Sequence, residues 1–191
     1  MLIVYRYLFP AMWLAWAAYW VASSRHVKVT ARRESSSSRR WHVVPLAIVA
    51  ALLLWRARTP LPVLGERFMP LAAWPFWLGS ALTAAGLLFA VWARAHLGGN
   101  WSGTVTIKKD HELITSGPYA IVRHPIYSGL LLAFVGSAMA RGDWGGVLAV
   151  ALAFWALWRK SRIEERWMHD EFGEAYQDYR RRVAALVPFV L

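Results

Sequence analysis

The stretch Gly117–Gly129, GPYAIVRHPIYSG, decides the fold because it leads directly into an apolar run. Pro125 has no amide hydrogen and disfavours helical geometry at His124, so a helix is predicted to begin at Pro125. Two further motifs follow along the chain, Arg162–Glu165 (RIEE) and Phe172–Tyr179 (FGEAYQDY). Together these motifs place ionisable side chains at the ends of membrane-length apolar runs, where charge is costly and usually functional.

Five apolar runs predict an all-α protein that crosses a membrane. They are Leu2–Ala22, Trp41–Trp55, Leu71–Ala93, Ile126–Ala140 and Trp144–Trp158. At 1.5 Å per residue, the first and third runs can cross a hydrocarbon core of ~30 Å, whereas the other three are short for it. We expect a polytopic bundle of about five spans, whose short runs borrow flanking residues, thin the bilayer or form tight hairpins. Residues 1–93 would form a three-span region and residues 94–191 the catalytic region.

The composition supports a membrane protein and excludes several other classes. The 191 residues are 58% hydrophobic and include 13 Trp, which is more apolar surface than one small soluble core can bury. The net charge of +11 is spread between apolar runs and forms no aromatic-interleaved patch, so no nucleic-acid partner is expected. Without cysteine there is no disulfide framework or thiolate nucleophile. No two histidines have helical ligand spacing, so no metal site is expected.

The positions of Lys and Arg predict the orientation in the membrane. Six lie in Ser23–Arg40, four in Arg94–His124 and seven from Arg159 onward, which places 17 of 22 on one side. Cytoplasmic loops carry the excess of these residues, so the N-terminus is expected outside and the C-terminus inside. The small size favours a bacterial-type inner membrane.

Three other patterns give local expectations. Trp residues at run ends, such as Trp41 and Trp144, are typical of membrane-interface anchors. The serine run Ser35–Ser38 is typical of a flexible, solvated loop. Beyond Trp158 the pattern predicts one amphipathic helix on the inner membrane face, with an apolar stripe of Met168, Phe172, Tyr176, Tyr179 and Val183.

Two acidic residues, Glu164 and Glu165, are candidates for the chemistry. Helical spacing would put Lys160 beside Glu164 and Arg162 beside Glu165. In the simplest interpretation these are surface ion pairs of little energetic value. In the functional interpretation one carboxylate binds a cationic amino group and one cation holds an anionic substrate, which makes Lys160, Arg162 and Glu165 catalytic candidates. A carboxylate substrate is already ionised at neutral pH, so its reaction as a nucleophile requires alignment in a dry pocket rather than a strong base.

These motifs, together with HLGGNWS at residues 96–102 and HELIT at residues 111–115, resemble the isoprenylcysteine carboxyl methyltransferase family of integral membrane enzymes, which is related to phospholipid methyltransferases. The resemblance implies S-adenosyl-L-methionine as methyl donor and a lipophilic small molecule or lipid as acceptor. It also implies that a basic residue one turn before Glu164 contacts the acceptor carboxylate, a position that Lys160 occupies, with Arg162 the nearest alternative. The donor-binding residues that it implies are His111, Glu112, Leu113, Ile114, Tyr119, His124, Pro125, Ile126, Tyr127 and Glu164.

Three alternatives stay open at the level of sequence. A phospholipid N-methyltransferase would share the RHPIY and Glu-Glu motifs and would methylate an amine. An NADPH-dependent sterol reductase would share the start of the helix after His124. A non-catalytic lipid-binding protein would need none of this chemistry. The segment HELI at residues 111–114 and the Glu164–Glu165 pair favour the methyltransferase, and no glycine-rich GxGxxG motif indicates a soluble dinucleotide fold.

Overall fold

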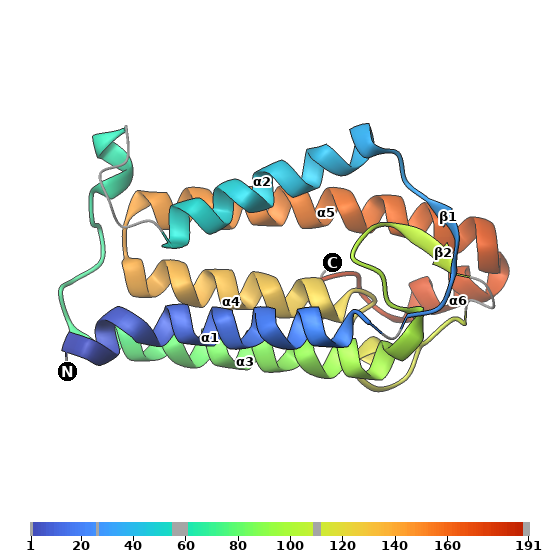
Figure 1. Ribbon diagram of the computed structural model, residues 1–191, viewed down its shortest axis with the longest axis horizontal. Coiled ribbons are helices and arrows are strands. Elements are labelled where there is room, and N and C mark those ends of the chain that lie inside the picture. The colour runs from blue at the N-terminus through green and yellow to red at the C-terminus, as the bar shows by residue number, and fades with distance from the viewer. Residues whose placement is uncertain (1, 26, 55–60, 109–111, 189–191) are drawn as a thin grey trace.

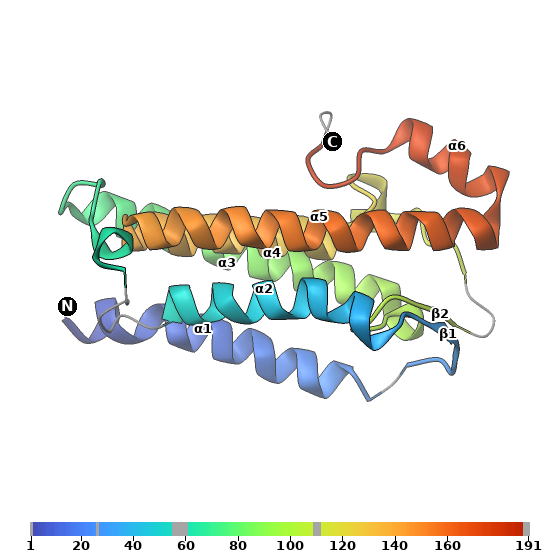
Figure 2. The same ribbon diagram turned by 90° about the horizontal axis from the view of Figure 1, so that it is seen from above.

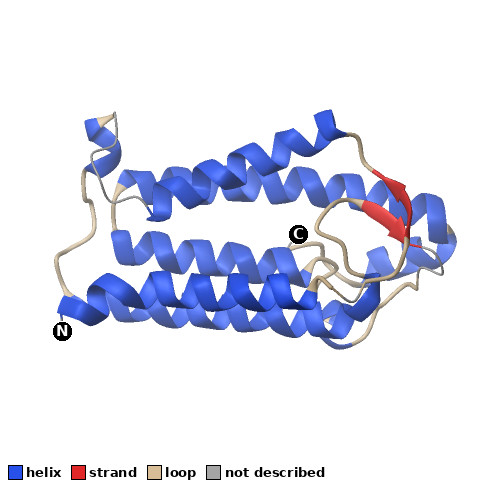
Figure 3. Ribbon diagram, in the orientation of Figure 1, coloured by secondary structure: helices blue, strands red, loops and turns tan. Residues whose placement is uncertain are grey.

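The computed structural model describes residues 2–188 except 26, 55–60 and 109–111, and it is mainly helical (Figure 1). The helices are α1 (Leu2–Ser23), α2 (Ser36–Leu54), α3 (Ala73–Leu97), α4 (Pro125–Arg141), α5 (Trp144–Phe172) and α6 (Glu174–Arg182). Short 3-10 helices cover Pro62–Gly65, Gly98–Asn100 and Gly117–Ala120. Two strands, β1 (Thr30–Arg33) and β2 (Thr106–Lys108), pair antiparallel. The expected all-α class is therefore correct for the body of the protein, with one small sheet added (Figure 3).

The five long helices run side by side along the long axis of the molecule (Figures 1 and 2). Helix α4 packs against α3 and α5, and α2 packs against α5. At one end, α5 extends past the other long helices, and the small sheet and α6 gather around it (Figure 1). The C-terminal segment then turns back toward the start of α4, as its hydrogen bonds with residues 123 and 124 require.

Small residues allow α3 and α4 to approach at backbone distance. An added Cβ on Gly129 would lie 2.5 Å from the carbonyl oxygen of Gly86, and one on Gly136 would lie 2.4 Å from that of Gly79. The sequence places Gly129, Ala133 and Gly136 on one helical face, which is the spacing that close helix packing in membranes uses. This face is used for packing between helices.

A tight turn connects α4 to α5, as the three residues Arg141–Asp143 predict. Gly142 has a φ of 66°, a left-handed conformation that glycine adopts without steric cost. The Asp143 carboxylate accepts a hydrogen bond from the Gly146 amide at 2.9 Å and so caps α5. Residues 66–69 dock on this turn, with the Phe68 amide donating to the Gly142 carbonyl at 3.0 Å.

The expectation of one continuous C-terminal amphipathic helix is wrong. Helix α5 ends at Phe172, and Gly173, with a φ of 54°, redirects the chain into α6. A residue other than glycine would be strained in this conformation, so Gly173 is where the helix breaks. Tyr176 and Tyr179 on α6 are nevertheless buried, as the apolar stripe predicts.

The region that was expected to be a solvated loop is also more ordered than predicted. The Ser35 hydroxyl accepts a hydrogen bond from the Ser38 amide at 3.3 Å, so the serine run starts α2. Just before it, the Glu34 amide donates to the Val105 carbonyl at 3.0 Å, next to the paired strands. Strands of three and four residues are too short to show a clear hydrophobic period, so periodicity does not predict them.

The number of membrane spans stays a prediction. Among the described residues, the helical segment Ala73–Asn100 is long and apolar enough by itself to cross a membrane, and Pro125–Arg141 is a shorter apolar helix. Helices α2 and α5 have 19 and 29 residues, so each extends beyond the apolar run that predicted it. At 1.5 Å per residue they reach about 28 and 43 Å, although among the described residues neither passes the hydropathy test that Ala73–Asn100 passes. Trp55, the end of one run, lies outside the described residues.

Substitution of Gly129 by Ala should destabilise the bundle by about 1–3 kcal/mol, because the added methyl group cannot fit against the α3 backbone. The measurement is thermal or denaturant unfolding of the detergent-purified protein. Gly65→Ala is the matched control, because a Cβ there would meet no heavy atom within 4 Å. Equal stability of the two variants would contradict the close packing of α3 and α4.

Candidate functional site

A cavity of about 240 Å³ lies at the end of the bundle where the sheet, the start of α4 and α6 come together. Lys160 of α5 contributes to its wall, but Arg162 and Glu165 do not. His111 lies outside the described residues. The other nine residues that the sequence assigned to donor binding all line the cavity: Glu112, Leu113, Ile114, Tyr119, His124, Pro125, Ile126, Tyr127 and Glu164.

The entrance to α4 has the geometry that its proline predicts. Pro125 is the first helical residue, and the carbonyl of His124 accepts the amides of Tyr127 and Ser128 at 2.9 and 3.0 Å. The amide of His124 itself donates to Ala185 at 3.0 Å, in the C-terminal segment. The backbone around His124 is therefore held from both sides, by the helix and by the chain end.

Four charged side chains meet below this entrance. Arg123 donates from Nε and Nη2 to Glu165 Oε1 at 2.9 and 2.5 Å, and it also donates to the carbonyls of Val183 and Arg180. His124 lies between the two carboxylates, with Nε2 3.4 Å from Glu165 Oε1 and Nδ1 3.5 Å from Glu164 Oε2. These distances join the start of α4, the middle of α5 and the C-terminal segment in one cluster.

The charges of this cluster stabilise one another. Burial by itself would lower the pKa of His124, but the adjacent carboxylates of Glu164 and Glu165 raise it above its ordinary value. Burial would raise the pKa of Glu165, yet His124 and Arg123 lower it to about 2. The pKa of Glu164 is also lowered, against the effect of burial, by His124, Lys160 and Tyr127. These shifts favour the ionised form of both carboxylates and the protonated form of His124, so the opposite charges in the cluster support one another.

Of the two carboxylates in the cluster, Glu164 lines the cavity, as Arg123 and His124 also do, whereas Glu165 does not. Glu164 Oε1 accepts the Tyr127 hydroxyl at 2.5 Å, while the Tyr127 ring stacks on His124 with centroids 5.5 Å apart. The Glu164 side chain keeps 23% of its surface exposed, against 6% for Glu165. Glu165 thus supports Arg123 and His124, whereas Glu164 presents its carboxylate to the cavity.

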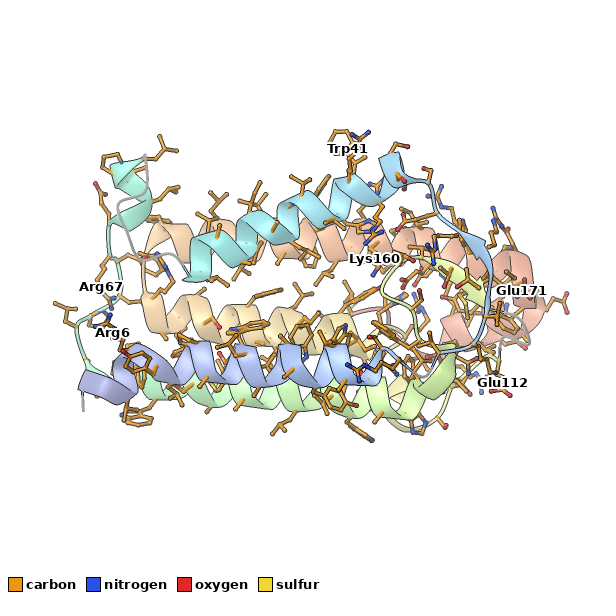
Figure 4. All side chains as sticks on the ribbon, viewed as in Figure 1. Arg6, Trp41, Arg67, Glu112, Lys160 and Glu171 are labelled. Carbon is orange, nitrogen blue, oxygen red and sulfur yellow. The ribbon has the colours of Figure 1, made fainter. Side chains whose placement is uncertain are left out.

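The two basic candidates on α5 have different environments. Lys160 is buried, its Nζ donates to the Gly103 carbonyl at 3.1 Å, and it lies 5.2 Å from the centre of the Tyr127 ring (Figure 4). The Arg162 side chain is 53% exposed and lies 3.9 Å from Glu165. The expected Arg162–Glu165 pair is present, but Lys160 points into the cavity wall and forms no ion pair with a described carboxylate.

Two tyrosines of α6 complete the wall opposite α5. The Tyr179 hydroxyl donates to the Tyr119 carbonyl at 2.6 Å, which ties α6 to the 3-10 turn before α4. Burial raises the pKa of both the Tyr176 and the Tyr179 phenol, so both are neutral at neutral pH. Tyr176 and Tyr179 were not assigned to the site from the sequence, although the motif FGEAYQDY contains them.

Three tryptophans form an aromatic wall that sequence reasoning also missed. Trp16 stacks on Trp20 with centroids 4.7 Å apart, and Trp20 meets Trp101 edge to face at 5.4 Å. All three line the cavity, whereas Trp41 and Trp144, which the sequence predicts as interface anchors, are exposed. The four-residue spacing of Trp16 and Trp20, which places both on one helical face, was the available signal.

Glu112 supplies a second carboxylate at the cavity rim. Its Oε2 accepts the Asn100 amide at 3.2 Å and lies 3.4 Å from Lys28 Nζ. Its side chain is 68% exposed, so it differs in environment from the enclosed Glu164. Leu113 and Ile114 follow it along the same wall.

Comparisons with known proteins identify a family and several relatives for this chain. Residues 74–175 match the family described as phospholipid methyltransferase. The chain is 34% identical to protein-S-isoprenylcysteine O-methyltransferase of Schizosaccharomyces pombe over 101 aligned residues. The aligned region covers 51% of this chain and 43% of the relative. It is 32% identical over 116 residues to protein-S-isoprenylcysteine O-methyltransferase B of Arabidopsis thaliana, covering 59% and 55%.

A third relative covers more of the chain. The cobalt-zinc-cadmium resistance protein CzcN of Cupriavidus metallidurans is 30% identical over 149 residues, which is 78% of this chain and 62% of the relative. The chain thus spans between 43% and 62% of the length of these three curated relatives.

Proposed function

The chain belongs to the phospholipid methyltransferase family, and we propose that it methylates the carboxylate of a lipophilic acceptor with S-adenosyl-L-methionine as methyl donor. The observation that carries this proposal is the presence of a buried lysine, Lys160, and a carboxylate, Glu164, in the wall of one cavity. The names of two relatives, protein-S-isoprenylcysteine O-methyltransferases, favour oxygen as the atom that is methylated.

The residues of the cavity fit the methyl donor. Glu164 offers an ionised carboxylate to an ammonium group, an interaction that is strong where water is excluded. The rings of Tyr119, Tyr176 and Tyr179 line the same cavity and offer apolar and π surface to a flat base or a sulfonium. When bound, S-adenosyl-L-methionine supplies an electrophilic methyl group on sulfur.

Lys160 would hold the acceptor carboxylate in line with that methyl group. Glu164 would hold the methyl donor, which would supply its methyl group to the acceptor oxygen and keep the electron pair of the carbon–sulfur bond on sulfur. The acceptor is already ionised, so no proton has to be removed. The protein therefore needs to supply a cation, alignment and exclusion of water, and Leu46, Leu130 and Leu157 give the cavity apolar walls.

We further propose that α1–α5 span the membrane with the cavity at the cytoplasmic face. The cavity lies at the end of the bundle that carries β1, the start of α2 and α6, which are rich in Lys and Arg (Figure 1). A lipophilic acceptor would then reach Trp16, Trp20 and Leu46 directly from the hydrocarbon layer, without exposing its chain to water.

An N-methyltransferase acting on an amine headgroup is the second candidate. The aromatic wall of Trp16, Trp20 and Trp101 favours it, because aromatic faces attract cations. Lys160 opposes it, because the buried ammonium group would repel a cationic acceptor.

The Glu164→Gln variant should bind S-adenosyl-L-methionine more weakly by about 1.5–3 kcal/mol, the range for a hydrogen bond to a charged group. Calorimetry on the detergent-purified protein gives the dissociation constant, and circular dichroism checks that the fold is kept. Glu171→Gln, an exposed change at the end of α5, is the matched control. An unchanged dissociation constant in Glu164→Gln, or binding of NADPH in place of the methyl donor, would rule out the proposed donor site.

The Lys160→Ala variant should reduce carboxyl methylation at least about tenfold, because it removes the cation that holds the acceptor. Membranes are incubated with methyl-labelled donor and a small prenylated thio-carboxylate, and the lipophilic product is treated with mild base. A methyl ester releases labelled methanol, whereas an N-methyl amine keeps its label. Arg162→Ala is the control, because Arg162 lies outside the cavity, and its rate should stay within about twofold. Label that survives base would shift the assignment to the N-methyltransferase.

Single cysteines test the orientation directly, because the chain has none of its own. Val63→Cys and Ala175→Cys place exposed thiols at opposite ends of the bundle. A membrane-impermeant maleimide should label Val63→Cys in intact cells and Ala175→Cys only after permeabilisation, as the distribution of Lys and Arg requires. The reverse pattern would place the cavity on the outer face, away from the cytosolic pool of methyl donor.

A further inference from the structure

We propose that a second cavity, at the opposite end of the bundle, binds the phosphate and upper acyl chain of a membrane phospholipid with a net anionic headgroup. This cavity has a volume of about 430 Å³, within the usual range of about 300–1,000 Å³ for ligand sites. It lies between α1, the start of α3 and the α4–α5 turn. Figure 4 labels Arg6 and Arg67 at this end, far from Glu112 and Glu171 at the other.

Three guanidinium groups lie in its wall, and one of them is already neutralised. Arg141 donates to both carboxylate oxygens of Asp143, at 2.7 and 3.2 Å. Arg67 donates to the backbone carbonyl of Arg141, which leaves its charge uncompensated. The side chain of Arg6 is exposed and lies 5.5 Å from the centre of the Tyr7 ring. No Asp or Glu is among the described residues that line this cavity, so an anion would meet two available positive charges.

The position of Arg67 is fixed by the fold. Its backbone pairs with Asp143 in an isolated antiparallel bridge, and the following residue, Phe68, is hydrogen-bonded to Gly142. The guanidinium is therefore held over the cavity by the α4–α5 turn. A planar guanidinium in a fixed place suits two phosphate oxygens.

The rest of the wall is apolar and continues into the bundle. Phe9, Trp13, Leu53 and Phe76 line it below the arginines. Trp13 follows Arg6 by two helical turns, which is about 10 Å deeper at 1.5 Å per residue. The Trp13 indole N–H donates a hydrogen bond to Ser137 Oγ at 3.1 Å. With its polar group satisfied, this side chain offers an apolar surface to the cavity.

The combination of two available arginines and an apolar wall favours an amphiphile over a free anion. Inorganic phosphate would contact the arginines and leave the apolar wall unused. A phospholipid would place its phosphate between Arg6 and Arg67 at headgroup depth and its acyl chain along the aromatic rings. A zwitterionic headgroup would bring its own ammonium next to the two cations, so a net anionic headgroup is preferred.

Native mass spectrometry of the full chain in detergent, without methyl donor, tests this site. Dioleoyl-phosphatidylglycerol should bind at least about tenfold more tightly than dioleoyl-phosphatidylcholine, and Arg6→Gln/Arg67→Gln should remove that difference. Arg40→Gln, an exposed arginine at the other end of the bundle, should keep it. The single variant Arg6→Gln, which leaves the Arg67–Arg141 hydrogen bond intact, should lose part of the preference even if the double variant does not fold.

Three results would overturn the proposal. The first is equal affinity of the wild-type protein for the two lipids, and the second is an unchanged preference in Arg6→Gln. The third is displacement of phosphatidylglycerol by inorganic phosphate at equal concentration, which would identify a simple anion site. None of these readouts depends on methyl transfer. The lipid-binding proposal can therefore fail without affecting the proposed function, and the reverse also holds.

Discussion

The buried ion pairs between Arg123, His124, Glu164 and Glu165 are the constraint on which the functional end depends. Burial of an unpaired charge is very costly, so each member is stable there only because the others are present. The loss of one partner from such a cluster typically costs about 3–5 kcal/mol. Because the four residues come from two distant parts of the chain, their pairing determines how α4 meets α5.

The balance of charge inside this cluster gives Lys160 its distinct character. Glu165 is paired with Arg123 and His124, and Glu164 already interacts with His124 and Tyr127. Lys160 is a buried cation that donates to a backbone carbonyl, lies over an aromatic ring and forms no ion pair within 4 Å with a described carboxylate, although its charge lowers the pKa of Glu164. A single helical turn thus separates the carboxylate proposed for the methyl donor from the cation proposed for the acceptor.

Much of the fold could be predicted because it depends on local chemistry. Pro125 fixed the start of α4, the Arg141–Asp143 turn joined two helices, and the glycines at residues 129 and 136 marked a packing face. The break at Gly173 was not predicted, because the apolar stripe continues through it and a positive φ leaves no trace in a hydrophobic period. The strands β1 and β2 were missed because each is stable only when paired with a segment distant in sequence.

The sequence by itself determined the candidate site residues near the start of α4 and on α5, because charged residues beside apolar runs are costly and therefore conspicuous. It did not decide which of them share a cavity. Lys160 and Arg162 are two residues apart on one helix, so they face different directions, and only packing against Tyr127 and Gly103 shows that Lys160 points inward. The walls built from α1 and α6 were likewise decided by tertiary structure, because Trp16, Trp20 and Tyr179 reach the site through contacts with residues far away in the chain.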